Sequence, residues 1–342
     1  MVGFFFLGVS QAFGREEQSK LIEGAKKEGK VVYWSTGLTP PLAKALEEGY
    51  KKKYGLPKEF EVVFAPQRTT EIMAKLTQEI RANRLTVDII SGAMPEFYYD
   101  LLRAGELMKY DSPEYRHIPQ VKGLCYEPGY WAPTISMSFV MMWNPKHVKK
   151  NLVTYNDLLD PQFKGMIVSG DPMKSESYLM YYVGLRKILG KDFMVKLAKQ
   201  DILWLTRSPD VTTRVVTGEK PVAFMGNNRT AYIAAQEGAD IKVVYPKEGV
   251  VILSNPYAIL AKAPRPNAAK LFIDYVSSAE GQKHIIEMAG YFIGRDDVPF
   301  PPKVREFTPP ISKINLIPME WSSFTEKELK AARKEFMEIF GK

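Results

Sequence analysis

The strongest constraint on the fold is a unit of strand, turn and helix that occurs three times near the start of the chain. The β-branched and aromatic run "KVVYWSTG" at 30–37 is followed by apolar residues at helical spacing over 40–55. Residues 60–82 and 87–107 repeat the same order. Strands that alternate with helices of this length predict an α/β fold, with a parallel sheet covered by helices on both faces.

The turns after these strands form the first candidate site, because ligands of such sheets bind beyond the carboxyl ends of the strands. Hydroxyl groups and backbone N–H groups at helix N-termini suit a carboxylate or a phosphonate. An ordinary strand-to-helix turn is the alternative for the first three residues, and a solvated surface side chain is the alternative for the arginine. The residues expected to share this edge are Ser35, Thr36, Gly37, Gln67, Arg68, Ser91 and Gly92.

A second set of strands and helices follows a long apolar strand, "TISMSFVMMWN", at 134–144. This set runs from about Thr154 to Tyr245. The chain then returns to apolar strand at 250–260, to a helix over 266–290 and to a final amphipathic helix near Glu326–Phe340. With 342 residues, of which 45% are hydrophobic, the chain is long enough for two domains, each with its own core.

Charge and cysteine content exclude several classes of protein. The 47 Lys and Arg residues exceed the 39 Asp and Glu residues, but they are scattered among acids. We therefore expect a solvated surface that attracts anions weakly, and no nucleic-acid partner. The single cysteine, Cys125, excludes an internal disulfide and a cysteine-rich zinc site.

The first residues, "MVGFFFLGVSQAFGREEQ", have the short apolar core and the small residues of a signal peptide. We expect a signal peptide over 1–14, cleavage near Ala12 and a soluble periplasmic product. No basic residue precedes the apolar core. An upstream start and a buried N-terminal segment therefore stay open as alternatives.

Four segments in this order resemble a known family over nearly the whole mature chain. The segments are "AKKEGKVVYWSTG", "YNDLLDPQFKGMIVSGDP", "GEKPVAFMGNNRTAYIAAQEGADIKVVYP" and "NAAKLFIDYVSSAEGQ". They are similar to the type 2 extracellular solute-binding proteins of ABC transporters, in the branch of ferric-ion, phosphonate and sugar-phosphate binders.

This resemblance implies a two-lobed type 2 periplasmic-binding-protein fold with a ligand cleft between the lobes. Lobe 1 would comprise 28–140 and 250–342, and lobe 2 would comprise 141–249. If the chain crosses only near 133–144 and 245–254, two short strands resist hinge bending, and a ligand that contacts both lobes favours the closed state. The resemblance also implies a monomer without a cofactor or catalysis, which delivers its ligand to an inner-membrane ABC permease.

The segment "AFMGNNRTAYIAA" places a strand directly before a helix that begins with Asn227, Asn228 and Arg229. Either asparagine could cap the first turn, and a well-capped helix start is the simpler interpretation for Asn227. Arg229 is harder to explain in this way, because a cation in the first turn opposes the helix dipole. A bound anion would explain the arginine.

The resemblance also raises ferric iron as an alternative ligand. In the ferric-binding branch two adjacent tyrosines hold the metal where this chain has Arg229 and Thr230. Fe(III) prefers anionic oxygen ligands, which "STGLTP" does not offer. Tyr181 and Tyr182 are a possible substitute pair, but adjacent helical residues point about 100° apart and the segment resembles a core helix.

Further ligand candidates carry simpler alternatives. Asp171 could accept a hydrogen bond from a ligand amine or shape a turn, and Trp131 could stack on a ligand or belong to the core. Ser254 and Asn255 lie near the second crossover. Polyamines would require several carboxylates in the cleft, and only Asp171 is apparent. The set as a whole favours a small carboxylate, phosphonate or phosphate ester.

An enzyme on the same bilobal fold is another possible class of protein, and Cys125 and the three histidines are the candidate catalytic residues. Cys125 in "GLCYEPG" has no adjacent base, and the three histidines, His117, His147 and His284, form no recognisable motif. A transcriptional effector domain would need a helix-turn-helix before the first lobe, where the chain is too short for one. We therefore expect a binding protein with no catalytic residues and no metal site.

Overall fold

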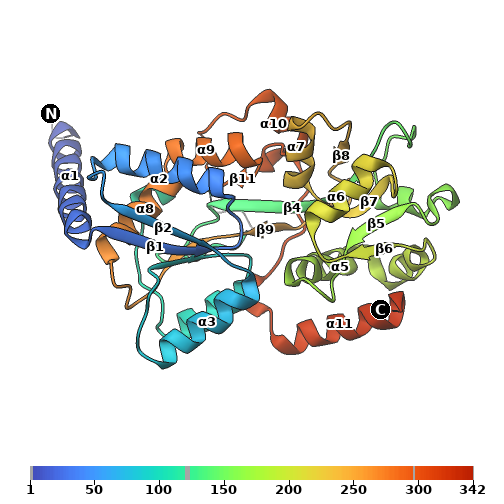
Figure 1. Ribbon diagram of the computed structural model, residues 1–342, viewed down its shortest axis with the longest axis horizontal. Coiled ribbons are helices and arrows are strands. Elements are labelled where there is room, and N and C mark those ends of the chain that lie inside the picture. Colours follow the sequence, from blue (N-terminus) through green and yellow to red (C-terminus); the bar gives the residue numbers. More distant parts are fainter. Residues whose placement is uncertain (1–2, 120–123, 296, 342) are drawn as a thin grey trace.

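The computed structural model describes residues 3–119, 124–295 and 297–341 and contains two α/β lobes, seen at the left and right of Figure 1. The sheet of the first lobe has the strand order β10-β3-β1-β2. Its first three strands along the chain pair in parallel, as the sequence predicts, and β10 is antiparallel to β3. The strands are β1 (Lys30–Ser35), β2 (Glu61–Pro66), β3 (Ile89–Ser91) and β10 (Tyr257–Ile259).

The helices of this lobe begin at the carboxyl ends of the parallel strands. The order β1-α2, β2-α3 and β3-α4 follows the predicted repeat, and further helices pack on the sheet from distant parts of the chain. Tyr33 of β1 stacks between Phe64 of β2 and Phe272, with ring centroids 5.3 and 4.7 Å away. The helices are α2 (Pro40–Tyr54), α3 (Thr69–Arg81), α4 (Pro95–Arg103), α8 (Pro266–Ser277) and α9 (Ala279–Ala289).

The second sheet has the order β11-β4-β7-β5-β6, and β8 and β9 also pair with β4. Strand β5 pairs in parallel with β6 and β7, as expected for a second strand-and-helix unit. The strands are β4 (Ile135–Trp143), β5 (Ile167–Gly170), β6 (Leu203–Leu205), β7 (Val222–Asn227), β8 (Lys242–Val244), β9 (Ile252–Ser254) and β11 (Phe292–Ile293). The principal helices are α5 (Glu176–Ala198), α6 (Ser208–Thr217) and α7 (Asn228–Gln236).

Strand β4 connects the two lobes, and Figure 1 shows it crossing the centre of the molecule. Its first residues pair with β9 and β11, and its last residues pair with β7 and β8. The return of the chain, β9, runs antiparallel beside it, with Ser136 opposite Ser254. Two adjacent strands thus carry the chain between the lobes, within the two ranges expected from the sequence, and the chain passes to the second lobe once more before its last helix.

The expected single helix over 266–290 is instead two helices, α8 and α9. The chain turns at Ser278, which has extended backbone angles and whose hydroxyl accepts a hydrogen bond from the backbone N–H of Gly281. A serine in extended conformation is a favourable N-cap, so the helix ends and a new one begins there. The helical periodicity of the apolar residues continues across the break and conceals it.

The last helix, α11 (Glu326–Phe340), packs against α5 of the second lobe. The ring of Phe336 contacts those of Tyr182 and Trp204, at centroid distances of 5.2 and 4.9 Å. Figure 1 shows α11 below the second lobe, with the C-terminus beside it. The lobe boundaries stay a prediction, but this helix, which we expected in lobe 1, buries its apolar face on lobe 2.

The N-terminal segment forms one helix, α1 (Gly3–Glu28), which continues past the predicted cleavage point. The carboxylate of Glu28 accepts hydrogen bonds from the backbone N–H groups of Asn267 and Ala268, at 3.1 and 2.8 Å, and so caps α8. The signal peptide stays a prediction, and residues 1–2 lie outside the described residues. Within the described residues, no helix combines the length and hydrophobicity needed to cross a bilayer.

Candidate functional site

The turns after β1, β2 and β3 meet at one edge of the first sheet, as the sequence predicts. The backbone N–H of Gln67 donates to Ser35 O at 3.2 Å, and that of Thr36 donates to Ser91 O at 3.0 Å. A Cβ atom on Gly92 would lie 3.0 Å from the Thr36 side chain. The hydroxyls of Ser35 and Ser91 are buried and bind within the lobe, and both backbone polar groups of Gly37 are hydrogen-bonded. The half-buried side chains of Thr36 and Gln67 are the parts of this edge that remain for a ligand.

The first turn of α7 faces this edge through the side chain of Arg229. Asn227 is the N-cap, and its side-chain oxygen accepts a hydrogen bond from the backbone N–H of Arg229 at 3.0 Å. The guanidinium carbon of Arg229 lies 4.7 Å from the centre of the Tyr291 ring. Arg229 Nε is buried and has no hydrogen-bond partner within the described part of the chain.

Tyr291 connects Arg229 to the first lobe. Its hydroxyl donates a hydrogen bond to the backbone oxygen of Gly37. A Cβ atom on Gly37 would lie 2.9 Å from both Tyr291 Oη and Asn255 Nδ2, so the backbone of Gly37 is in close contact with both side chains. We call Gly37, Arg229, Asn255 and Tyr291 the Arg229 cluster. It joins residues from four separate parts of the chain.

Burial and the charge of Arg229 shift the pKa of the Tyr291 hydroxyl in opposite directions. Burial raises the pKa of its hydroxyl, and the nearby Arg229 guanidinium lowers it, with burial the larger effect. The hydroxyl is therefore neutral at physiological pH and can donate to Gly37. The only charge that the cluster itself contributes is the guanidinium of Arg229.

Two predicted ligand residues, Asn228 and Trp131, have side chains that are buried and contact other parts of the protein. Asn228 is fully buried, and it accepts from the backbone N–H of Ser138 at 3.0 Å and donates to Thr308 Oγ1 at 2.8 Å. Trp131 is fully buried beside the rings of Tyr98 and Tyr99. Both side chains are therefore packed within the fold in this conformation, and a ligand role for either stays a prediction.

Arg68, Asp171 and Ser254 lie at the surface or bond within the fold in this conformation, and their ligand roles stay predictions. The side chain of Arg68 is 86% exposed and lies 4.0 Å from Glu71, as expected for a solvated surface residue. Asp171 accepts from the backbone N–H of Met173 at 2.8 Å and so shapes a turn. Ser254 Oγ lies 3.1 Å from Ser136 Oγ and links the two crossover strands. These side chains have structural or surface roles in this conformation.

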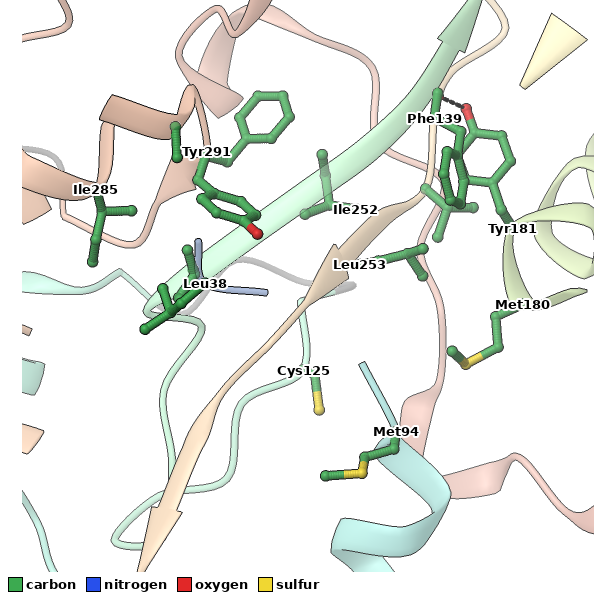
Figure 2. Packing of buried hydrophobic residues seen from close by; sticks show 14 of the residues in the cluster. Leu38, Met94, Cys125, Phe139, Met180, Tyr181, Ile252, Leu253, Ile285 and Tyr291 are labelled. Carbon is green, nitrogen blue, oxygen red and sulfur yellow. Dashed lines mark hydrogen bonds between the residues drawn. The ribbon is translucent and has the colours of Figure 1, made fainter. Parts of the chain in front are cut away.

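The tyrosine pair considered for iron belongs to the core. The hydroxyl of Tyr181 lies 3.0 Å from that of Tyr155 and donates to the backbone oxygen of Phe139, a bond drawn in Figure 2. Burial raises the pKa of Tyr181, which opposes the phenolate form that iron requires. Among the residues described, no group of three or more His, Cys, Asp and Glu side chains could hold a metal ion.

Cys125 is buried, and burial raises the pKa of its thiol to about 12. The thiolate is therefore scarce at neutral pH, and a thiolate is what a nucleophilic cysteine requires. Figure 2 shows the side chain among apolar neighbours, and it lines a small enclosed space together with Met180 and Leu253. Its environment is that of a structural thiol.

A cavity of about 360 Å³ lies between α3 and α4 of the first lobe and α5 and α11 of the second. The cavity adjoins the predicted sheet edge, because Thr69 and Ala93 follow β2 and β3, but its lining was not predicted from the sequence since α11 was expected elsewhere. Burial raises the pKa of Glu96, and neighbouring carboxylates raise it further. Only Arg333, bonded to Glu176, adds positive charge to the lining. The carboxylates that line the cavity are Glu96, Asp100, Glu176 and Glu326.

Two α/β lobes that meet at two crossover strands, with a polar cluster formed by both, define a bilobal ligand-binding protein. The profile of the family described as "Bacterial extracellular solute-binding protein" matches residues 45–307, which is most of the chain. The chain therefore belongs to this family of solute-binding proteins. The family is a substrate-binding component of transport systems and not a class of enzymes.

Solved structures with the same fold cover nearly the whole chain. One is the periplasmic binding protein AfuA from Actinobacillus pleuropneumoniae, with exogenous fructose-6-phosphate bound: 19% identity, TM-score 0.74, and 91% of this chain and 99% of that chain covered. Another is iron-bound HitA from Pseudomonas aeruginosa, at 20% identity and TM-score 0.72, with the same coverage. At these identities the similarity shows the fold alone.

A curated relative is the spermidine/putrescine-binding periplasmic protein of Escherichia coli (strain K12). It is 24% identical to this chain over 153 residues. The match covers 42% of this chain and 42% of the relative, so the chain spans less than half the length of the curated relative that it matches.

Proposed function

We propose that this protein captures a small anionic organic solute at the Arg229 cluster and delivers it to an ABC permease. The observation that carries the proposal is Arg229 Nε, a charged donor that is buried without a partner in the described part of the chain. Arg229 as a whole is half-buried, but water does not reach Nε, and an anion that accepts from Nε would give this donor a partner. A carboxylate, phosphonate or phosphate ester matches the guanidinium.

The position of the cluster supports a hinge mechanism. Arg229 comes from α7 of the second lobe, and Gly37 follows β1 of the first lobe. An anion bound here would contact both lobes and favour the conformation in which they approach each other. A permease that recognises this closed form would then receive only the loaded protein. We propose a periplasmic monomer, processed near Ala12, with no catalytic role.

The test is thermal unfolding of the ligand-stripped protein with phosphate esters, phosphonates, carboxylates, amino acids, polyamines and ferric citrate. A ligand at a hundredfold its dissociation constant should stabilise the protein by about 2.7 kcal/mol. Arg229→Met should abolish the shift caused by an anion. The matched control is Arg68→Met, which removes the same charge from an exposed side chain and should preserve the shift. An anion shift that survives in Arg229→Met would contradict the proposal.

A second candidate ligand is an organic polyamine, favoured by the acidic cavity between the lobes. The sequence alone shows only Asp171 as a carboxylate for a polyamine, but Glu96, Asp100 and Glu176 line one cavity of the folded protein. The curated relative is named for spermidine and putrescine. In the same panel, a shift with polyamines alone that is lost in Glu96→Gln would favour this candidate over the anion.

A further inference from the structure

The Arg229 cluster contains an unpaired acceptor as well as an unpaired donor. Asn255 is buried, and its Oδ1 has no hydrogen-bond partner within the described part of the chain. Most buried side-chain oxygens in proteins are satisfied, so an exception requires an explanation. An anion alone does not provide one, because an anionic oxygen accepts hydrogen bonds and does not donate them to Oδ1.

The position of Asn255 is fixed by its backbone. Its N–H donates to Ile135 O at 2.7 Å, and its carbonyl oxygen accepts from Ser91 Oγ at 3.3 Å. These bonds attach the residue to both the crossover strand β4 and the end of β3. The side chain adjoins Gly37, where a Cβ atom would lie 2.9 Å from its Nδ2. The backbone of Asn255 is thus held between β4 and β3, and its side-chain amide lies beside Gly37.

We propose that the solute is a hydroxylated acid, whose acidic group binds Arg229 and whose hydroxyl group binds the amide of Asn255. This inference rests on the proposed function. A ligand hydroxyl group can donate a hydrogen bond to Oδ1 and accept one from Nδ2. The Asn255 amide can therefore pair with both the donor and the acceptor of a single hydroxyl group. Hydroxy carboxylates and phosphate esters of polyols have this combination of groups.

The charge of the Arg229 cluster favours a hydroxyl group over an ammonium group as the ligand group that donates to Asn255 Oδ1. The acceptor is a neutral amide, and the cluster of Gly37, Arg229, Asn255 and Tyr291 contains no carboxylate. A buried ammonium group that meets only a neutral amide beside an arginine would be poorly compensated. A hydroxyl group carries no such cost.

Gly37 and Tyr291 link Arg229 to Asn255 through a chain of contacts. The backbone oxygen of Gly37 is already occupied by the Tyr291 hydroxyl, so neither of these groups competes for the ligand hydroxyl. The ring of Tyr291 lies under the Arg229 guanidinium and leaves its edge as the surface for an acid. Tyr291 therefore contacts Arg229 with its ring and Gly37, which adjoins Asn255, with its hydroxyl.

The test compares matched ligands by isothermal titration calorimetry with the ligand-stripped protein. Glycerol 3-phosphate is paired with propyl phosphate and with 3-aminopropyl phosphate, and gluconate is paired with hexanoate. We expect the hydroxylated member of at least one pair to bind about tenfold or more tightly than its deoxy partner, because the partner leaves the amide unsatisfied. In Asn255→Leu this preference should disappear, while binding of the deoxy acid persists.

The possible failures are distinct. Equal affinity for hydroxylated and deoxy acids, with Arg229→Met still abolishing both, would overturn this inference and leave the proposed function intact. Tighter binding of the aminopropyl ester would overturn the assignment of a hydroxyl group. If no acid in the panel binds the wild-type protein, the proposed function and this inference fall together. Because the comparison of ligand pairs uses the wild-type protein, it does not depend on whether Asn255→Leu folds.

Discussion

Arg229 and Tyr291 face each other across the junction of α7 and the segment after α9, with the guanidinium carbon 4.7 Å from the ring centre. The Tyr291 ring packs against the guanidinium of Arg229, and the Tyr291 hydroxyl donates a hydrogen bond to the backbone oxygen of Gly37. Tyr291 thus positions the charged group that we propose binds the ligand. The two residues are far apart in sequence, and neither has a motif that predicts the other.

Substitutions of Tyr291 should separate these two roles. Tyr291→Phe removes the hydrogen bond to Gly37 and should lower the free energy of unfolding by about 1 kcal/mol, while the ring still supports Arg229. Tyr291→Leu also removes the cation–π contact, worth about 0.5–2 kcal/mol, and should weaken anion binding as well. Urea unfolding and calorimetric titration would measure the two effects. Equal anion affinities in the two variants would show that the ring does not position Arg229.

Helix α11 offers two adjacent residues, one of them buried and the other exposed. Phe336 is fully buried against Tyr182 and Trp204, and Met337 is 46% exposed. We expect Phe336→Ala to lower the free energy of unfolding by about 3–5 kcal/mol, because it removes a buried aromatic ring and leaves a cavity. The control, Met337→Ala, should change it by less than about 0.5 kcal/mol. Similar losses in both, measured by urea unfolding, would contradict this packing.

Asp274 should make stability depend on pH. It is buried on α8, and burial raises the pKa of its carboxyl to about 7, although hydrogen bonds from Ser112 and Tyr110 lower it. The nearby Glu114 carboxylate raises this pKa, and Lys53 lowers it. The folded protein therefore binds the proton more tightly than the unfolded chain, whose aspartate pKa is about 3.9. This contribution to stability is complete below about pH 4 and is lost as the pH rises through about 7.

The measurement is the free energy of unfolding between pH 4 and 8 for wild type and Asp274→Asn. The difference in free energy between the two proteins should change by a few kcal/mol across this window, because the amide does not titrate. A constant difference would show that the carboxyl titrates in the folded protein as it does in the unfolded chain.

Cys125 should be inert in the folded protein. The raised pKa and the burial of its thiol predict little reaction with Ellman's reagent at pH 8, and complete reaction of this single cysteine in urea. Rapid reaction without denaturant would show that the loop around Cys125 opens readily. The same assay with the most strongly binding ligand would report whether ligand binding changes that opening.

Local patterns in the sequence determined much of the architecture. The alternation of strands and helices predicted both α/β lobes, and the long apolar strand at 134–144 predicted the first crossover. The cap at Asn227 and the unusual first-turn cation at Arg229 were also evident, because capping and the helix dipole depend on neighbours in the chain. These features involve residues only a few positions apart.

The tertiary structure alone decided which side chains remain available to a ligand. Asn228, next to Arg229 in the sequence, forms hydrogen bonds with Ser138 and Thr308 through its side chain. Asn255, in contrast, is buried with its side-chain oxygen unpaired within the described residues. Tyr291 was not a candidate until packing placed it under Arg229, and α11 helped to form the acidic cavity only by docking on lobe 2. The physical reason is that a side chain's hydrogen-bond partners come from whichever segments pack against it, and neither sequence periodicity nor local propensity specifies these segments.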